Sequence, residues 1–297
     1  MSWKDAAAQI PDLELRWDTE LTSYSTFRLR SRGDLFVVRS LAALARLLPL
    51  LKAHRISWRM LGWGANQVLA PQERDVLLQL DLPQDTATLG ELRDTYALSA
   101  SVGLNQLTSA ALRLGLVGWE VFTGIPASLG GAIAMNAGTA LGEIGDLVTT
   151  VTLMTSKGVV RTEAIGPGSF SYRKCNFLGS GEVIVGATLT HRGTSPEIGA
   201  KIRAYLEYRK ASQPLSSRNC GCVFKNASKT RQAGRLIALT GLKGAAVGAL
   251  RVSHRHANFM ENIGAADAED FRELARRLNT QVRLYWGVEF ELEVKAV

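Results

Sequence analysis

The chain has 297 residues, 46% hydrophobic and 21% charged, which is typical of a soluble globular protein of two or three packed units. Thirty-five Lys and Arg residues against 27 Asp and Glu give a formal net charge of +8 and favour anionic ligands, but the basic residues are too scattered to predict a nucleic-acid partner. The sequence shows neither a bilayer-spanning run nor a signal peptide, so we expect a cytoplasmic protein with no membrane partner.

The first predicted elements alternate between strands and a helix. Residues 34–38 (DLFVV) and 56–61 (ISWRML) predict strands, and residues 40–54 predict a helix capped by Ser40 and interrupted or kinked at Pro49. The glycine turn GWGANQVL follows at 62–69. Gln67 replaces the third glycine of the dinucleotide fingerprint, so the turn is either a plain tight turn or a loop whose backbone N–H groups face an anion.

A second glycine-rich segment follows two more predicted strands, at 75–82 and 96–103, and a helix at 105–115. The segment GIPASLGGAIAMNAG, at 124–138, contains almost no reactive side chain. Its bare backbone allows a flat or phosphorylated ligand to lie directly on the peptide groups. Two such segments within about seventy residues predict one long ligand that contacts both of them.

The last predicted elements are a helix at 267–286 capped by Asp267 and a strand at 288–294. The expected buried face of the helix contains Ala268, Phe271, Leu274, Ala275, Leu278, Val282 and Tyr285. The strand alternates apolar residues with Glu289, Glu291 and Glu293. The three cysteines, Cys175, Cys220 and Cys222, fit no zinc or disulfide pattern, so we expect reduced thiols and no bound metal.

Seven motifs in this order resemble the UDP-N-acetylenolpyruvoylglucosamine reductase family, from about Ser25 to Val294. They are GWGANQVL, GWEVFTGIPASLGGAIAMNAG, SYRKCNF, CGCVFKNA, AGRLIALTGLKG, SHRHANF and GVEFELEV. The resemblance implies an α+β fold, with a two-lobed FAD-binding region of the vanillyl-alcohol-oxidase (PCMH) type and a smaller α+β substrate-binding domain. The expected boundaries are 1–80 and 81–195 for the FAD-binding subdomains and 196–297 for the substrate-binding domain, whose last strand returns toward the flavin.

The resemblance also implies an activity and its cofactors. A monomer would bind FAD without covalent attachment and use NADPH to reduce UDP-N-acetylglucosamine enolpyruvate to UDP-N-acetylmuramate, a peptidoglycan precursor. The FAD contacts it implies are Gly62, Gly64, Ala65, Asn66, Gly124, Ile125, Gly130, Gly131, Ala132 and Asn136. The alternatives are another FAD-dependent oxidase or dehydrogenase of the same superfamily and a nucleotide- or RNA-binding protein without flavin.

Three residues match catalytic positions of the family. Arg173 would polarise the substrate carboxylate, and its planar guanidinium suits this task. Cys222 stands where most relatives have the serine that protonates the substrate carbon, and a thiol with an ordinary pKa of about 8.5 is a stronger acid than an alcohol. Glu293 would assist this protonation. The alternatives are a surface arginine, an inert or metal-binding thiol, and a solvent-facing carboxylate.

The residues that the resemblance assigns to the substrate are Tyr172, Arg209, Lys225, Asn226, His256 and Asn258. Ser212 replaces a lysine that relatives often have, so Lys210 or Arg209 would have to supply that charge. The segment TFRLRSRG at 26–33 departs from the family's TFRIGG, and the tyrosine-bearing loop of longer relatives is missing, which indicates a shorter subtype. His254 and His256 would face one side if they lay on a strand, a weak pattern for a metal pair.

Overall fold

The computed structural model describes residues 2–296 and consists of two compact units. The first contains residues 2–17, Asp34–Gly62 and Asp75–Leu206. The second contains Asp18–Gly33, Trp63–Arg74 and residues 207–296. Two segments from the N-terminal quarter of the chain therefore belong to the same unit as the C-terminal region.

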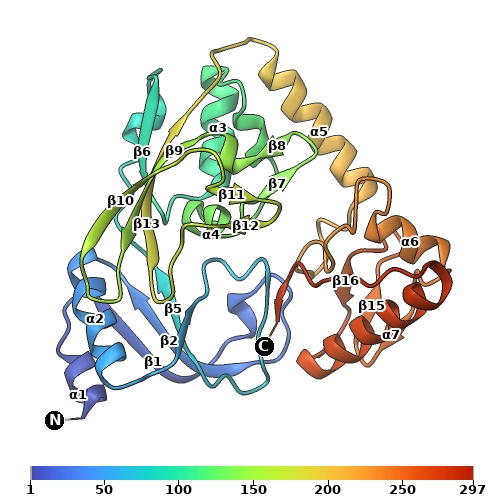
Figure 1. Cartoon of the computed structure of the whole chain (residues 1–297), viewed down its shortest axis with the longest axis horizontal. Helices are drawn as coiled ribbons and strands as arrows, with labels where there is room; N and C mark the ends of the chain where they lie inside the picture. Colours follow the sequence, from blue (N-terminus) through green and yellow to red (C-terminus); the bar gives the residue numbers. More distant parts are fainter. Residues whose placement is uncertain (1, 297) are drawn as a thin grey trace. The chain divides into compact units, whose positions relative to one another are not determined.

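The first unit contains a four-stranded sheet with the order β1-β2-β5-β3, in which β2 and β3 both run parallel to β5. Its elements are α1 (Trp3–Ala8), β1 (Leu13–Glu20), β2 (Arg32–Val38), α2 (Leu41–Ala53), β3 (Trp58–Met60) and β5 (Val76–Leu80). Ser40 caps α2 by accepting a hydrogen bond of 3.1 Å from Ala43 N, as predicted. The helix continues past Pro49 and buries its leucine face against this sheet (Figure 1).

The first unit also contains an antiparallel sheet with the order β10-β9-β13-β6. Its strands are β6 (Thr95–Ser99), β9 (Val148–Met154), β10 (Val160–Ala164) and β13 (Val183–Thr190). The helices α3 (Leu104–Leu114) and α4 (Leu129–Ala134) pack with it around the fully buried Trp119. Two short hairpins flank α4: β7 (Gly138–Thr139) with β8 (Gly142–Glu143), and β11 (Phe170–Ser171) with β12 (Lys174–Cys175) (Figure 1).

The second unit packs two helices and small sheets around one apolar core. Its elements are α6 (Ala233–Leu239), β14 (Ala246–Val247), β15 (Leu250–Val252), β16 (Met260–Asn262) and α7 (Ala268–Trp286), and β17 (Lys295–Ala296) pairs in parallel with β4 (Gln67–Val68). The helix α5 (Ile198–Ser212) runs from the first unit's chain segment into this one. Asp267 caps α7 as predicted, accepting hydrogen bonds from Glu269 N and Asp270 N.

Two predictions for the C-terminal region are wrong. Residues 288–294 do not form a strand, because only Leu292 makes a β-bridge, to Phe224, and pairing resumes at β17. Val288, Phe290 and Val294 are nevertheless buried, so their alternation reflects packing rather than strand pairing. Tyr285 is 69% exposed, because the last turn of α7 extends beyond the core that covers its other predicted apolar positions.

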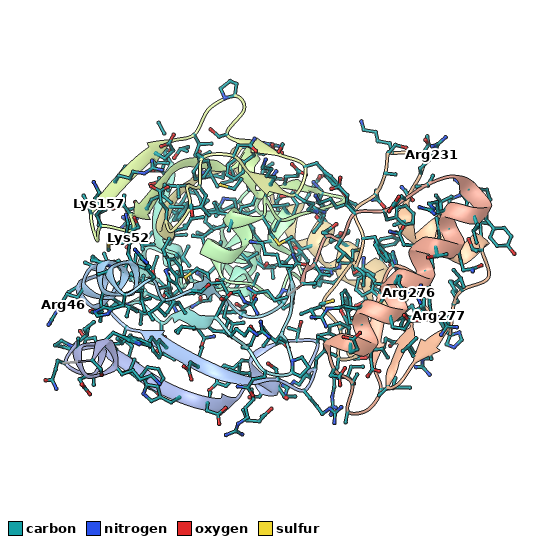
Figure 2. All side chains as sticks on the ribbon, turned by 60° about the horizontal axis from the view of Figure 1, so that its bottom comes forward. Arg46, Lys52, Lys157, Arg231, Arg276 and Arg277 are labelled. Carbon is teal, nitrogen blue, oxygen red and sulfur yellow. The ribbon has the colours of Figure 1, made fainter. Side chains whose placement is uncertain are left out.

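The positive charge is spread over both units. Figure 2 labels Arg46 and Lys52 on α2 and Lys157 in the turn between β9 and β10, all in the first unit. It also labels Arg231, Arg276 and Arg277, which belong to the second unit. None of the helices within residues 2–296 combines the length and apolar composition needed to cross a bilayer. No group of three or more potential metal-ligating side chains gathers in this part of the chain.

An ion pair with a buried carboxylate holds α5 against the rest of the first unit. Glu120 is 3% exposed, accepts a hydrogen bond of 2.6 Å from Gly118 N and forms a short ion pair with Lys201 of α5. Burial alone would raise the pKa of Glu120, but the hydrogen bonds from Lys201 and from backbone N–H groups outweigh it and lower this pKa. The folded state therefore favours the ionised carboxylate.

We predict that Lys201→Met lowers the free energy of unfolding by about 1–2 kcal/mol at pH 7, because Glu120 keeps its burial but loses its cation. Since the pKa of Glu120 is lowered by folding, its stabilisation is complete above about pH 5 and is lost as the pH falls through the folded-state pKa. Urea unfolding at pH 7 and pH 4 measures both effects. Lys210→Met is the control, since its partner Glu207 is exposed; equal losses in the two variants would contradict the prediction.

Candidate functional site

The two glycine-rich segments meet in the first unit, at Ser128. A Cβ added at Gly62 would lie 3.9 Å from Ser128 Oγ, and one added at Gly131 would lie 3.3 Å from the same oxygen. Ser128 caps α4, and the carbonyl of Gly62 accepts a hydrogen bond of 3.0 Å from Gln79 Nε2 on β5. The bare backbone at these two positions forms a cradle that side chains would fill, and it fits a flat or phosphorylated group such as part of FAD.

The other residues of the glycine-rich segment 124–138 pack into the core next to this cradle or remain accessible beside it. A Cβ at Gly130 would lie 2.8 Å from the Cβ of Ala100, so a glycine is needed where α4 crosses the end of β6. Ala132 is fully buried in the core, whereas Gly124 is exposed and has a φ of +72°. Ile125 is half-buried. The segment therefore combines small residues that pack inward with glycine backbone that remains accessible.

The remainder of the first glycine loop belongs to the second unit. Gly64 has a φ of +63°, and a Cβ there would lie 2.2 Å from the carbonyl oxygen of Tyr24, so only glycine fits. Ala65 is half-buried beside it. Asn66 donates a hydrogen bond of 3.2 Å from Nδ2 to the carbonyl of Glu293, and its own carbonyl accepts one of 3.1 Å from Lys295 N. The loop is thereby joined to the region of Glu293.

The second unit also brings Cys222 and Glu293 together. Glu293 N donates a hydrogen bond of 2.8 Å to the carbonyl of Val223, the residue after Cys222. Burial raises the pKa of the neighbouring Cys220 thiol, and the proximity of Cys222 and Glu293 raises this pKa further. The side chains of Cys222 and Glu293 are half-buried, and all three cysteines of the chain are free thiols. The backbone bond and the shared proximity to Cys220 place Cys222 and Glu293 in one region of the second unit. A thiol and a carboxylate are both groups that can transfer protons.

Arg173 and Asn136 adjoin in the first unit, and both have left-handed backbone. Their φ values are +56° and +46°, which is costly for residues other than glycine and is frequent at functional sites. The Arg173 guanidinium donates to the carbonyls of Gly138, at 3.0 Å, and Asn136, at 3.4 Å, and lies 5.1 Å from the ring centre of the adjacent Tyr172. Tyr172 itself is 46% exposed. The hydrogen bonds hold the cation in one place.

A cavity of about 310 Å³ lies in the second unit, with Cys222 in its wall. Asn226, His256 and Asn258 also line it, together with three cations, Arg235, Lys243 and Arg255. No carboxylate is found among the described residues of the wall. Burial, followed by the charge of Lys243, lowers the pKa of His256, which is therefore neutral at pH 7. The cavity suits a polar ligand that carries several negative charges.

Two asparagines of this wall also organise the backbone around it. Asn258 accepts a hydrogen bond of 3.0 Å from Phe224 N and donates one of 2.8 Å to the carbonyl of the same residue. Asn226 accepts a hydrogen bond of 2.9 Å from Ala233 N, at the start of α6. These bonds hold the segment that follows Cys222 against the cavity.

The other predicted substrate residues of the second unit lie outside this wall. Lys225 forms an ion pair of 2.9 Å with Glu291, and Arg209 donates a hydrogen bond of 2.9 Å to Gln213. His254 and His256 lie in a loop rather than on a strand and pack against different glycines, Gly244 and Gly234. Sequence reasoning missed Arg235, Lys243 and Arg255, although all three belong to motifs that carry the resemblance, AGRLIALTGLKG and SHRHANF.

Two family profiles match the chain. Residues 213–297 match the profile described as UDP-N-acetylenolpyruvoylglucosamine reductase, C-terminal domain, and residues 35–163 match that of an FAD binding domain. UDP-N-acetylenolpyruvoylglucosamine reductase from Anaeromyxobacter dehalogenans is 37% identical over 298 residues, covering 99% of this chain and 89% of the relative. The Streptococcus pneumoniae enzyme of the same name is 32% identical, with 95% and 94% covered.

A solved structure agrees with these matches. The crystal structure of UDP-N-acetylenolpyruvylglucosamine reductase from Thermus caldophilus superposes with a TM-score of 0.78 at 30% identity, covering 96% of this chain and 98% of that one. This likeness and the FAD-binding profile confirm the predicted α+β fold with an FAD-binding region. The chain therefore belongs to the UDP-N-acetylenolpyruvoylglucosamine reductase family.

Proposed function

We infer that the chain catalyses the reaction of its family, the FAD-dependent reduction of UDP-N-acetylglucosamine enolpyruvate to UDP-N-acetylmuramate, with NADPH as the reductant. The observation that carries this inference, beside the family membership, is the position of Cys222 in the wall of a cavity with three cations and next to the backbone of Glu293. A different FAD oxidase or dehydrogenase would have no need for this combination. We place the reaction in the cytoplasm, in a monomer without membrane or nucleic-acid partners.

The cradle at Gly62, Gly131 and Ser128 is the part of the first unit that would hold FAD, together with the accessible backbone around Gly124. Gly64, Ala65 and Asn66 would contact its pyrophosphate through backbone N–H groups. When bound, FAD supplies the hydride that NADPH delivers to it. The residues of this chain bind the cofactor, orient the substrate and move one proton.

The substrate's UDP group would occupy the cavity of the second unit. Arg235, Lys243 and Arg255 provide positive charge for its diphosphate, and the absence of carboxylates among the described wall residues avoids repulsion. The neutral His256, together with Asn226 and Asn258, offers hydrogen-bonding groups for the sugar or the base. We propose Tyr172, Arg209 and Lys225 as further substrate contacts. Lys225 forms an ion pair with Glu291, and it would have to leave this partner to bind the substrate.

Three residues would act on the enolpyruvyl group. Arg173 would bind the carboxylate and stabilise the negative charge that develops when hydride adds to the terminal carbon. Cys222 would then donate its proton to the carbon next to the carboxylate, and Glu293 would assist this transfer. Since one carbon of the double bond accepts a hydride and the other accepts a proton, the double bond is reduced without any other co-reactant.

The flavin spectrum of the protein reports both proposed half-reactions. Purified protein reconstituted with FAD should show the oxidised flavin bands, lose them when NADPH is added without oxygen, and regain them when the UDP-enolpyruvyl sugar is added. Bands that bleach and do not recover would point to a different oxidising substrate. Protein that takes up no FAD would contradict the cofactor assignment.

Substitution of Cys222 tests its role as the proton donor. Cys222→Ala should slow flavin reoxidation by the UDP-enolpyruvyl sugar about 10²- to 10⁴-fold, because the carbon loses its general acid, while reduction by NADPH stays within about twofold. Cys222→Ser should recover most of the rate, because serine occupies this position in most relatives. Stopped-flow absorbance separates the two half-reactions. Cys220→Ala is the matched control, and an unchanged reoxidation rate in Cys222→Ala would exclude the thiol as the donor.

A further inference from the structure

Glu143 on β8 contacts both functional residues of the first unit that have left-handed backbone. Its Oε2 accepts a hydrogen bond of 2.7 Å from Asn136 Nδ2, and its Oε1 lies 3.7 Å from Arg173 Nη1. The glycine motifs gave no reason to single out this residue in the sequence. The carboxylate therefore connects the end of the predicted FAD segment with the predicted carboxylate-binding arginine.

The surroundings of this carboxylate leave little room for movement. A Cβ at Gly138 would lie 2.9 Å from both Arg173 Nη1 and Glu143 Cγ, so the hairpin β7–β8 packs directly onto the guanidinium. Asn136 is held by two more hydrogen bonds, from Gly145 N to its Oδ1 at 3.1 Å and from its Nδ2 to the carbonyl of Ser171 at 3.1 Å. The last of these ties Asn136 to β11, whose hairpin carries Arg173.

The ion pair between Arg173 and Glu143 is partly buried. The side chain of Arg173 is 16% exposed and that of Glu143 is 35% exposed, so water screens their interaction less than on an open surface. Two backbone carbonyls accept hydrogen bonds from the guanidinium, and the carboxylate adds a charged partner at Nη1. Such contacts fix the position of the cation before the substrate arrives, which avoids a reorganisation cost during the reaction.

We propose that Glu143 is a positioning residue that holds Arg173 for the carboxylate of the substrate, an assignment that rests on the function proposed above. Glu143 does not touch the reacting atoms in this role. It acts through Arg173, and it links the orientation of Arg173 to that of Asn136. The negative charge of Glu143 reduces the attraction of Arg173 for an anion, and the fixed geometry compensates for this loss.

The test is a double-mutant cycle with Glu143→Gln and Arg173→Gln, measured on the FAD-loaded enzyme. Glu143→Gln retains an amide oxygen that can accept from Asn136, and it replaces the charged oxygen that faces Arg173 with a neutral NH2 group that cannot accept from the guanidinium. It should slow reoxidation by the UDP-enolpyruvyl sugar about 10- to 100-fold and leave reduction by NADPH within about twofold. In the Arg173→Gln background the same change should alter reoxidation by less than about twofold, because nothing remains to be positioned.

A second measurement does not depend on turnover. Calorimetric titration compares UDP-N-acetylmuramate, which carries the carboxylate, with UDP-N-acetylglucosamine, which lacks it. Glu143→Gln should raise the Kd of the first about tenfold and leave that of the second unchanged. Asp146→Asn, in the same turn but paired with the exposed Arg192, is the control and should change neither Kd. If Glu143→Gln does not fold, Glu143→Asp replaces it in both measurements. Because aspartate keeps the charge on a shorter side chain, it should hold Arg173 less well and raise the Kd of UDP-N-acetylmuramate by less than about tenfold.

The outcomes separate this proposal from the proposed function. Wild-type protein whose reduced flavin is not reoxidised by the UDP-enolpyruvyl sugar would overturn the function. Wild-type turnover with a Glu143→Gln variant that reoxidises normally, or that loses both half-reactions and both UDP-sugar affinities equally, would overturn only the role of Glu143. Additive effects in the double-mutant cycle would do the same, because they would show that Glu143 acts independently of Arg173.

Discussion

The site of the second unit depends on the hydrogen bond from Glu293 N to the carbonyl of Val223. This bond places the segment after residue 290 beside the segment that carries Cys222, and it is continued by the bond from Lys225 N to Glu291 O. Asn66 then binds the carbonyl of Glu293, so three stretches far apart in sequence converge on one backbone position. The bond from Glu293 N to the carbonyl of Val223 thereby holds the segment of Glu293, and with it the glycine loop, beside Cys222.

In the first unit, the functional residues are positioned by glycines, whose lack of a side chain lets neighbouring segments pack closely. Gly130 admits α4 against the end of β6, and Gly138 admits the hairpin β7–β8 against Arg173. Because these glycines allow backbone to approach so closely, the polar groups of Asn136, Glu143 and Arg173 reach one another directly. The strained backbone at Asn136 and Arg173 is stabilised by these same hydrogen bonds, which explains why neither residue needs to be glycine.

Much of the architecture could be predicted because local signals are strong where a helix or strand buries one face. The caps at Ser40 and Asp267 are examples, since a side-chain oxygen directly before an apolar repeat marks a helix start. Residues 288–294 were misassigned because alternation also arises when an irregular segment buries every second side chain. The cations Arg235, Lys243 and Arg255 could not be found from spacing, because tertiary folding alone gathers them around one cavity. The role of Glu143 depends in the same way on the pairing of two short hairpins.

The discontinuous make-up of the second unit has a consequence for how the chain folds during synthesis. Phe27, Leu29 and Val68 belong to its core, yet the residues that cover them begin only at 207. At a translation rate of about 5–20 residues per second, these apolar side chains wait on the order of 10 s for their partners. The first unit can complete most of its packing in that interval, while the early segments of the second remain open to solvent or to a chaperone. Order of synthesis thus lets the second unit, which contains the cation-lined cavity, complete its core only after the chain of the first unit has been made.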